Sequence, residues 1–293
     1  MSRSEVETAP ALLPQSGGTL VGTLLCLASI VCVQFGSALS APVMRELGPV
    51  ATTWLRLAFA ALVLMLAIRP RMASYSRRQW LSALQLGLAI SAMTLAFYAA
   101  IGRIPLGLTV AIEFLGPLSV AAFGLRRGFA LVWPLLAVAG VFLLSRIGEG
   151  HFDEPLGLGF AAFAGIGWGA YIILTKRIGA AFPGLEGLAM SMLAAALITT
   201  PFGLATLDAL PSPHTLLAVA GVAVLTPLLP YALELIALRR LPMSVFGILM
   251  SLEPAAGALA GYLILDQVMT APQLVGTALV VLASVGVTRA AGA

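Results

Sequence analysis

The sequence predicts an all-α membrane protein of ten transmembrane helices, arranged as two five-helix repeats of opposite orientation. Of its 293 residues, 60% are hydrophobic and only 10% are charged, which leaves too little polar surface for a soluble domain of this size. Ten apolar stretches are long enough to cross a bilayer, which takes roughly 20 residues per helix. One pattern, Arg-x-Pro-x11-Pro-x6-Gly, also occurs in both halves.

Hydropathy places the ten helices in order along the chain. They are expected near residues 20–41, 50–68, 80–101, 105–124, 129–145, 156–175, 185–205, 215–238, 242–265 and 271–288. The connections are short, so no extramembrane domain is expected and all chemistry should occur within the helical bundle.

The chain divides into a leader and two units. Residues 1–18 lack periodicity and predict a disordered cytoplasmic leader. A cleaved signal peptide is disfavoured, because the first helix is needed as the repeat partner of the sixth. The first five-helix unit is expected at 19–148 and the second at 149–293.

The basic residues are distributed unevenly between alternate loops. Twelve of the 16 Lys and Arg lie in the leader or in loops on one predicted side, against Arg45, Arg103 and Arg146 on the other. Positive loops stay in the cytoplasm, so both termini are expected there. The net charge of +4 is explained by this topology and does not indicate a nucleic-acid partner.

The repeated pattern relates the two halves by a nearly constant offset. Shifting by 137 residues places Arg103, Pro105, Pro117 and Gly124 on Arg240, Pro242, Pro254 and Gly261. A shift of 133 places Phe35-Gly36 on Trp168-Gly169. An odd number of crossings per unit turns the second unit upside down, which is the architecture of carriers with alternating access.

Proline is expected to interrupt the fourth and ninth helices. Pro117 and Pro254 each remove a backbone donor and leave the carbonyl four residues earlier without its usual partner. At membrane depth such carbonyls need a cavity or a polar neighbour. Gly116, Pro117 and Pro254 are therefore candidate helix breaks for gating, with static packing as the alternative.

Small residues also predict close helix contacts. Gly257 and Gly261 form a GxxxG motif in the ninth helix, which is typical of tightly packed membrane helices. Whether the contact lies within one protomer or across a homodimer stays open.

Three ionisable residues lie deep in predicted helices, where they are candidates for function. Glu113 lies roughly 12 Å below the outer face, at 1.5 Å per residue, and is expected to bind a substrate ammonium or a proton. Arg56 reaches a similar depth and either binds a substrate carboxylate in a bidentate fork or forms a static ion pair with Glu113. Glu253 serves either proton coupling or local helix stabilisation.

Three uncharged residues are further candidates for the pathway. Gln34 is expected as a hydrogen-bonding wall of the cavity. Trp168 and Tyr171, deep in the sixth helix, either line the pathway or pack the core.

Other polar and aromatic residues have simpler explanations. Tyr98, Trp54 and Tyr262 are expected as aromatic anchors near the outer interface. Glu234 is expected to pair with Arg239 at the membrane surface.

Nothing in the sequence predicts an enzyme, a metal site or a cofactor. Cys26 and Cys32 lie six residues apart and face different sides of one helix, so no disulfide is expected. His151 and His214 lie in separate predicted loops, and no nucleophile–base pair is visible.

Two segments resemble a known family. The sequences YAAIGRIPLGLTVAIEFLGPL at 98–118 and SLEPAAGALAGYLIL at 251–265 resemble the EamA-type branch of the drug/metabolite transporter superfamily. Within that branch, RIPLGLTVAIEFLGPL is most similar to bacterial threonine and homoserine exporters, in which a Glu of the fourth helix precedes Leu-Gly-Pro. One departure is Leu265-Asp266, where such chains often carry Gly-Glu.

The resemblance implies an inner-membrane efflux carrier without a cofactor, which exports small amino acids in exchange for protons. It carries over Glu113, Gly116 and Pro117 in the fourth helix, and Glu253 and Pro254 in the ninth. The expected partners are an amino-acid substrate, protons and membrane lipid. Efflux of lipophilic cations, drugs or other small metabolites remains the alternative function.

Overall fold

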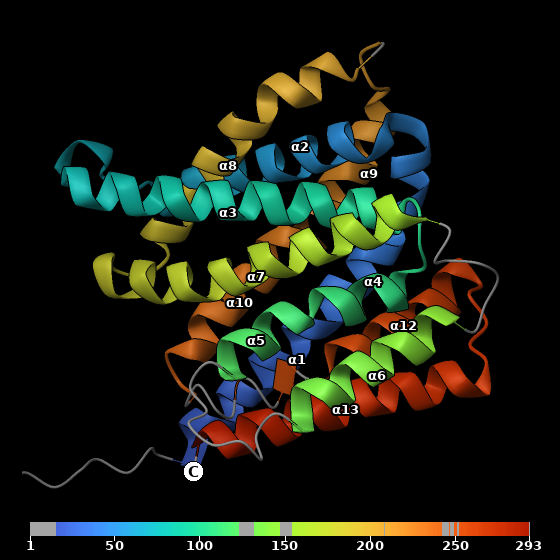
Figure 1. Ribbon diagram of the computed structural model, residues 1–293. Coiled ribbons are helices and arrows are strands. Elements are labelled where there is room, and N and C mark those ends of the chain that lie inside the picture. Colours follow the sequence, from blue (N-terminus) through green and yellow to red (C-terminus); the bar gives the residue numbers. More distant parts are fainter. Residues whose placement is uncertain are drawn as a thin grey trace, which may run out of the picture.

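The computed structural model describes residues 16–122, 132–146, 154–207, 209–241, 246, 249–250 and 252–292, and its regular elements are all helices (Figure 1). The elements are α1 (Ser16–Leu39), α2 (Ala41–Ile68), η1 (Met72–Ser74), α3 (Arg77–Ile101), α4 (Leu106–Glu113), α5 (Leu115–Ala122), α6 (Val132–Arg146), α7 (Pro155–Ala181), α8 (Glu186–Ala205), α9 (Pro213–Ala223), η4 (Val224–Leu228), α10 (Leu229–Leu238), α12 (Glu253–Leu265) and α13 (Ala271–Gly292). Six helical segments of the described chain are long and apolar enough to cross a membrane, and three shorter apolar helices accompany them. The expected all-helical membrane class is confirmed for these residues.

Two of the predicted spans are interrupted. The fourth divides at Phe114 into α4 and α5. The eighth divides at η4, where Thr226 has extended backbone angles (φ −160°, ψ 117°). Pro227 and Pro230 explain this second break, because neither can donate the backbone hydrogen bond that a continuous helix needs.

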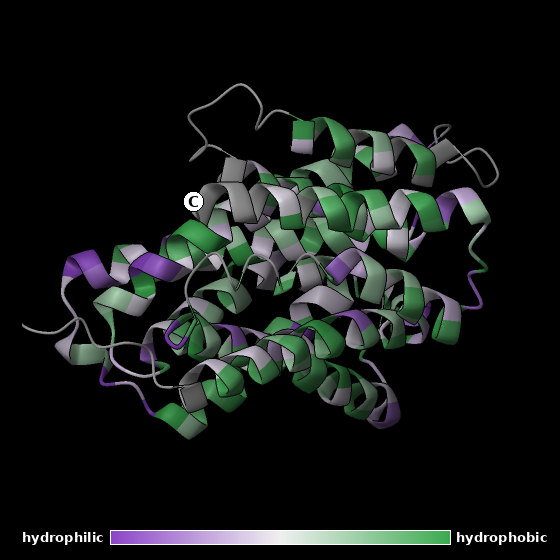
Figure 2. Ribbon diagram, turned by 90° about the horizontal axis from the view of Figure 1, so that it is seen from below, coloured by the Kyte–Doolittle hydropathy of each residue, from purple (hydrophilic) through white to green (hydrophobic). Residues whose placement is uncertain are grey.

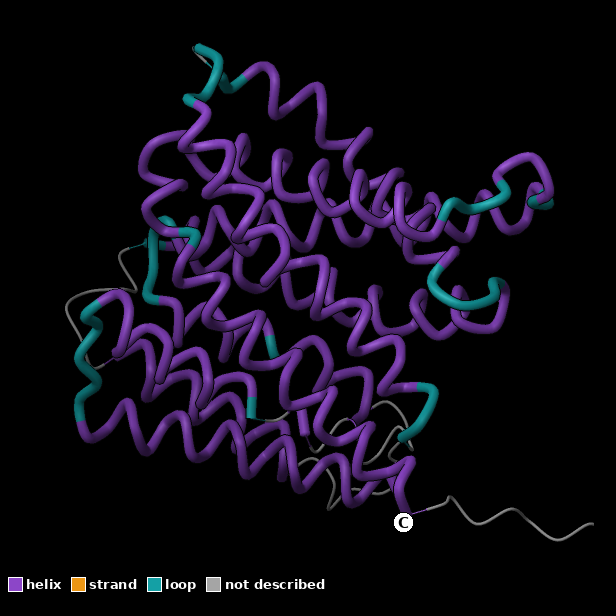
Figure 3. The backbone as a smooth tube through the Cα atoms, turned by 180° about the vertical axis from the view of Figure 1, so that it is seen from behind, coloured by secondary structure: helices purple, strands orange, loops and turns teal. Residues whose placement is uncertain are grey.

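Helices from the first half of the chain pack against helices from the second half. α3 lies against α7 and α8, while α1 lies against α10 and α12. α6 packs on α13, and α4 packs on α12. Most loops lie at the two ends of the bundle, with the helices running between them (Figure 3).

The sides of the bundle are apolar. Leu66, Leu135 and Ile166 lie in α2, α6 and α7, and each is more than 60% exposed. Hydrophobic residues likewise dominate the helices in Figure 2. This surface is suited to contact with lipid tails, in which exposed apolar side chains carry no penalty.

At one end of the bundle, hydrogen bonds connect the region where α3 begins to the region between α7 and α8. The Gln79 Nε2 donates to the Ala181 carbonyl at 2.9 Å, and the Tyr75 hydroxyl donates to the Glu186 carboxylate at 2.5 Å. Burial, and then the Glu186 carboxylate, raise the pKa of Tyr75 to about 12. The phenol therefore stays protonated at physiological pH. Glu186 lies in the first turn of α8, where a negative charge interacts favourably with the helix dipole.

At the other end, the contacts connect loops that carry fewer basic residues. The Thr215 hydroxyl donates to Glu46 Oε1 at 2.6 Å, and Arg103 pairs with Glu154 at 3.7 Å. Each of these two contacts joins connections that the charge pattern assigns to one side of the membrane.

Candidate functional site

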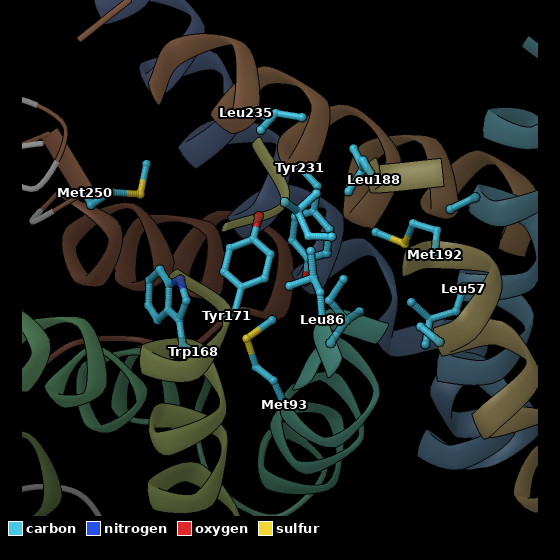
Figure 4. Packing of buried hydrophobic residues seen from close by; sticks show 14 of the residues in the cluster. Leu57, Leu86, Met93, Trp168, Tyr171, Leu188, Met192, Tyr231, Leu235 and Met250 are labelled. Atoms are coloured by element: carbon cyan, nitrogen blue, oxygen red, sulfur yellow. The ribbon is translucent and has the colours of Figure 1, made fainter. Parts of the chain in front are cut away.

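A small cavity lies where α1, α3, α4, α7, η4, α10 and α12 meet. Its volume is about 60 Å³, which is room for roughly four to six water molecules. Three carboxylates reach its wall, from Glu113, Glu234 and Glu253. Aromatic rings form much of the remaining wall: Phe97, Tyr98, Trp168 and Tyr231. Within the interior, Trp168, Tyr171, Met93 and Tyr231 gather between α3, α7 and α10 (Figure 4).

Glu113 is the last residue of α4, directly before the break at Phe114. Pro117 has no N–H, so the Glu113 carbonyl loses its usual helical donor. The Glu113 side chain is 8% exposed, and no hydrogen bond to it is found in the described part of the chain. Glu113 therefore lies at the helix break and at the cavity wall.

Close backbone contact fixes the position of this break. A Cβ on Gly116 would collide with the Gly165 carbonyl of α7, and a Cβ on Gly165 would lie 2.8 Å from the Glu113 carbonyl. Only glycine allows the two backbones to approach this closely. Gly116 and Pro117 lie in the first turn of α5, directly after this break.

Glu253 begins α12, and Pro254 lies in the first turn of that helix. The Glu253 carboxylate is buried and accepts a hydrogen bond from Gln34 Nε2 of α1. The Gln34 Oε1 is buried and has no partner among the described residues. Pro254 was expected to leave the carbonyl of Met250 unpaired. The next residue, 251, lies outside the described part of the chain.

Glu234 is a third cavity carboxylate, and the expected pair with Arg239 is wrong. Its side chain is 5% exposed and accepts hydrogen bonds from Ser29 Oγ at 2.7 Å and the Tyr171 hydroxyl at 3.2 Å. Arg239 instead donates to the Gly184 carbonyl. Five helical positions separate Glu234 from Arg239 by roughly 140° around the axis, so the two side chains face different surroundings. This spacing was the signal available in the sequence.

Arg56 does not pair with Glu113, so the expected static ion pair is also wrong. Its Nε and Nη2 donate to the Thr226 carbonyl at 2.9 Å and 2.5 Å. That carbonyl lacks a helical donor because Pro230, four residues later, has no N–H. Arg56 therefore supplies the hydrogen bonds that the broken helix cannot make for itself.

Tyr98 is an interior residue, which corrects its expected role as an interface anchor. It is 1% exposed, and the Arg56 guanidinium carbon lies 4.2 Å from its ring centroid. A cation over a ring face is attracted by the ring quadrupole. Tyr262 is 53% exposed, as an anchor would be, whereas Trp54 donates to the Thr200 hydroxyl at 2.9 Å.

Trp168 and Tyr171 both lie at the centre of the molecule. Trp168 packs edge-on against Phe114 at 5.6 Å, and Tyr171 packs against Tyr231 at 5.0 Å. Trp168 contributes to the cavity wall, while Tyr171 reaches the site through its hydrogen bond to Glu234.

The described residues offer no cluster of three or more His, Cys, Asp or Glu that could hold a metal ion. Cys26 and Cys32 are free thiols.

Comparison with known proteins supports a membrane transporter. A family model described as the EamA-like transporter family matches residues 155–289. The threonine/homoserine exporter RhtA of Salmonella typhimurium (strain SL1344) is 38% identical over 268 residues, covering 90% of each chain. The same exporter from Escherichia coli (strain K12) is 37% identical over the same length and share.

A solved structure, described only as a protein crystal structure, also matches. It covers 95% of this chain and 99% of its own, with a TM-score of 0.65 and 18% sequence identity. At that identity the likeness concerns the fold alone.

Proposed function

Because the chain belongs to the EamA-like transporter family, we propose that it exports small amino acids, similar to threonine or homoserine, across the bacterial inner membrane in exchange for protons. The observation that carries this proposal is the small cavity in which three carboxylates from different helices meet. The near full-length similarity to two threonine/homoserine exporters supports it.

The proposed architecture is ten spans in two inverted repeats, 19–148 and 149–293, with both termini in the cytoplasm. Helix contacts support it, since they occur in matching pairs. The contact of α1 with α10 has its counterpart in that of α7 with α3, and the contact of α1 with α12 matches that of α7 with α4. Such pairing is expected when two units related by a two-fold axis in the membrane plane pack together.

Local backbone features repeat as well. Gly48 and Gly184 both have positive φ, at 76° and 50°. Gly48 lies at a kink within α2, and Gly184 lies just before α8. Ser76 and Ser212 both cap the next helix by accepting a hydrogen bond from the backbone three residues on. Each pair is separated by 136 residues, close to the offset of the Arg-Pro pattern, and this supports a duplicated unit.

The size of the cavity favours a small substrate. Sites for drug-sized ligands enclose roughly 300–1,000 Å³, well above the 60 Å³ present here. Three carboxylates and several aromatic faces suit an ammonium group. The Arg56 guanidinium lies behind Tyr98 and Thr226, so its charge favours a substrate carboxylate on that side of the cavity.

In the proposed cycle Glu113 binds the substrate ammonium, and protons replace the substrate on cavity carboxylates after its release outside. The helix break beside Glu113, with Gly116 and Pro117, is the proposed moving part on one side, and Pro254 is its counterpart on the other. Trp168 forms part of the cavity wall, and Gln34 and Tyr171 support that wall through their hydrogen bonds to Glu253 and Glu234.

Export assays in inverted membrane vesicles test the role of Glu113. Glu113→Gln should abolish proton-driven uptake of threonine and homoserine, because the amide keeps the shape but loses the charge that holds the ammonium. Glu154→Gln, at the surface with Arg103, is the matched control and should transport normally. Unchanged activity of Glu113→Gln would remove this residue from the mechanism.

The second candidate function, efflux of lipophilic cations, is favoured by the same acidic and aromatic wall. It does not require the Arg56 charge near the cavity. Cells producing the protein should tolerate excess homoserine if the first proposal is right, whereas increased tolerance only to cationic dyes would support the second.

A further inference from the structure

The contact between Gln34 and Glu253 contains an unmet hydrogen bond. Gln34 is 1% exposed and Glu253 is 3% exposed. The Gln34 Nε2 donates to Glu253 Oε2, while the Gln34 Oε1 has no partner among the described residues. A buried acceptor without a donor costs about 1–3 kcal/mol, so its presence calls for an explanation.

The chemistry of the two groups supplies that explanation. An ionised carboxylate only accepts hydrogen bonds, whereas a protonated carboxyl group has one O–H to donate. A carboxylic acid beside a primary amide can form two hydrogen bonds, one in each direction. Only the protonated form of Glu253 can therefore provide the donor that the Gln34 Oε1 lacks.

We infer that Glu253 is the proton carrier of the transport cycle and that Gln34 is its positioning residue, which receives the carboxyl proton through Oε1. This inference rests on the proposed proton exchange. The proton arrives from the outer water, bonds to a Glu253 oxygen and leaves to the cytoplasmic water, and no other bond forms or breaks.

The other two cavity carboxylates are less suited to this role. Glu234 already has two hydroxyl partners, Ser29 and Tyr171. Glu113 has no fixed acceptor beside it in the described chain, which leaves it open to the substrate ammonium. Of the three, Glu253 is the one hydrogen-bonded to a side chain that carries an unpaired acceptor within the described residues.

The pair also links the two halves of the molecule. Gln34 lies on α1 and Glu253 on α12, 219 residues apart. A Cβ on Gly257 would lie 2.9 Å from Gln34 Oε1, so glycine at this position makes room for the amide. Protonation raises the number of hydrogen bonds between α1 and α12 from one to two, and so changes the contact between the halves.

Competition for charge couples the proton to the substrate. The titratable groups that face Glu253 are Glu113 from α4, Glu234 from α10 and Cys26 from α1, with the phenols of Tyr98 and Tyr231 on the same cavity. An ammonium among these groups and a proton on Glu253 neutralise the same negative charge. Binding of one therefore favours release of the other.

Purified full-length protein in proteoliposomes tests this assignment with two measurements. The first is exchange of labelled for unlabelled homoserine without a pH gradient, and the second is accumulation driven by a gradient. Glu253→Gln should lose gradient-driven accumulation down to the level of protein-free liposomes. The double swap Gln34→Glu with Glu253→Gln should restore accumulation, because it keeps one carboxyl and one amide across the same contact.

Gradient-driven accumulation by Glu253→Gln at the wild-type level would overturn the inference, and so would a double swap that exchanges but does not accumulate. Lack of homoserine exchange by the wild-type protein would instead overturn the proposed function, and the inference with it.

Infrared spectroscopy gives a second test that does not depend on how Glu253→Gln folds. Lowering the pH should produce a carboxylic-acid C=O band in the wild-type protein. Gln34→Met should shift that band to higher frequency, because the acid O–H loses its acceptor. An unshifted band would show that Gln34 does not receive the proton, and would overturn the inference.

Discussion

Arg56 shows how a single residue can stabilise a break in a membrane helix. A lipid environment offers no water to satisfy a carbonyl that proline has left unpaired. The guanidinium of Arg56 meets this need for Thr226, and it also stacks on Tyr98. From the sequence, Arg56 was expected to bind a substrate carboxylate or to pair with Glu113. Its guanidinium also binds a backbone carbonyl 170 residues away, that of Thr226.

Replacing Arg56 tests this role. Arg56→Met should lower the free energy of unfolding by about 1–3 kcal/mol, the cost of leaving a buried acceptor unsatisfied. Arg103→Met removes an arginine whose side chain is 44% exposed, and such a surface pair contributes about 0–1 kcal/mol. The thermal unfolding temperatures of the two purified variants in detergent are compared. Equal stability would contradict the role of Arg56 in stabilising the helix break.

The residue scale also shows where sequence reasoning stops. The depth of Glu113 and Glu253 in apolar helices was enough to single them out, because ionisable groups are rare there. Glu234 was misassigned because an arginine five positions away offered a simpler partner. Its actual partners, Ser29 and Tyr171, lie on other helices, and one sequence does not reveal which helices are neighbours.

At the scale of elements, hydropathy located most helices because lipid requires an apolar surface along each span. Breaks were anticipated at Pro117 and Pro254, since proline lacks the donor. The helical turn before Gly48 was not predicted; the structure includes it within α2. Short polar segments between spans carry no periodicity long enough to indicate such a turn.

The contact of α5 with α7 provides a test at this scale. Gly116→Ala should destabilise the protein by about 1–3 kcal/mol, as overpacking typically does, because the new methyl group collides with the Gly165 carbonyl. Gly159→Ala, on α7 itself, is the control, since nothing lies within 4 Å of its Cβ position. The thermal unfolding temperature and the rate of homoserine transport should both fall for Gly116→Ala, and neither should fall for Gly159→Ala. Normal behaviour of this variant would mean that α5 and α7 are not closely packed.

At the scale of the whole molecule, the paired helix contacts and the repeated turn and cap residues support a duplicated unit in two orientations. Two halves of opposite orientation can close the cavity at one end of the bundle and then at the other. The contacts of Gln79 with Ala181 at one end and of Thr215 with Glu46 at the other occupy matching positions in the two proposed units. In the proposed architecture, these two contacts open in turn.

The most direct measurement of this central claim is the membrane side of two equivalent positions. Ser74 and Leu210 are both exposed and lie 136 residues apart, each shortly before a capping serine. In a protein from which Cys26 and Cys32 have been removed, a cysteine at each position would be treated in intact cells with a membrane-impermeant maleimide. Inverted repeats predict that Leu210→Cys reacts from outside and Ser74→Cys reacts only in inverted vesicles. Reaction of both from the same side would contradict opposed orientation of the halves.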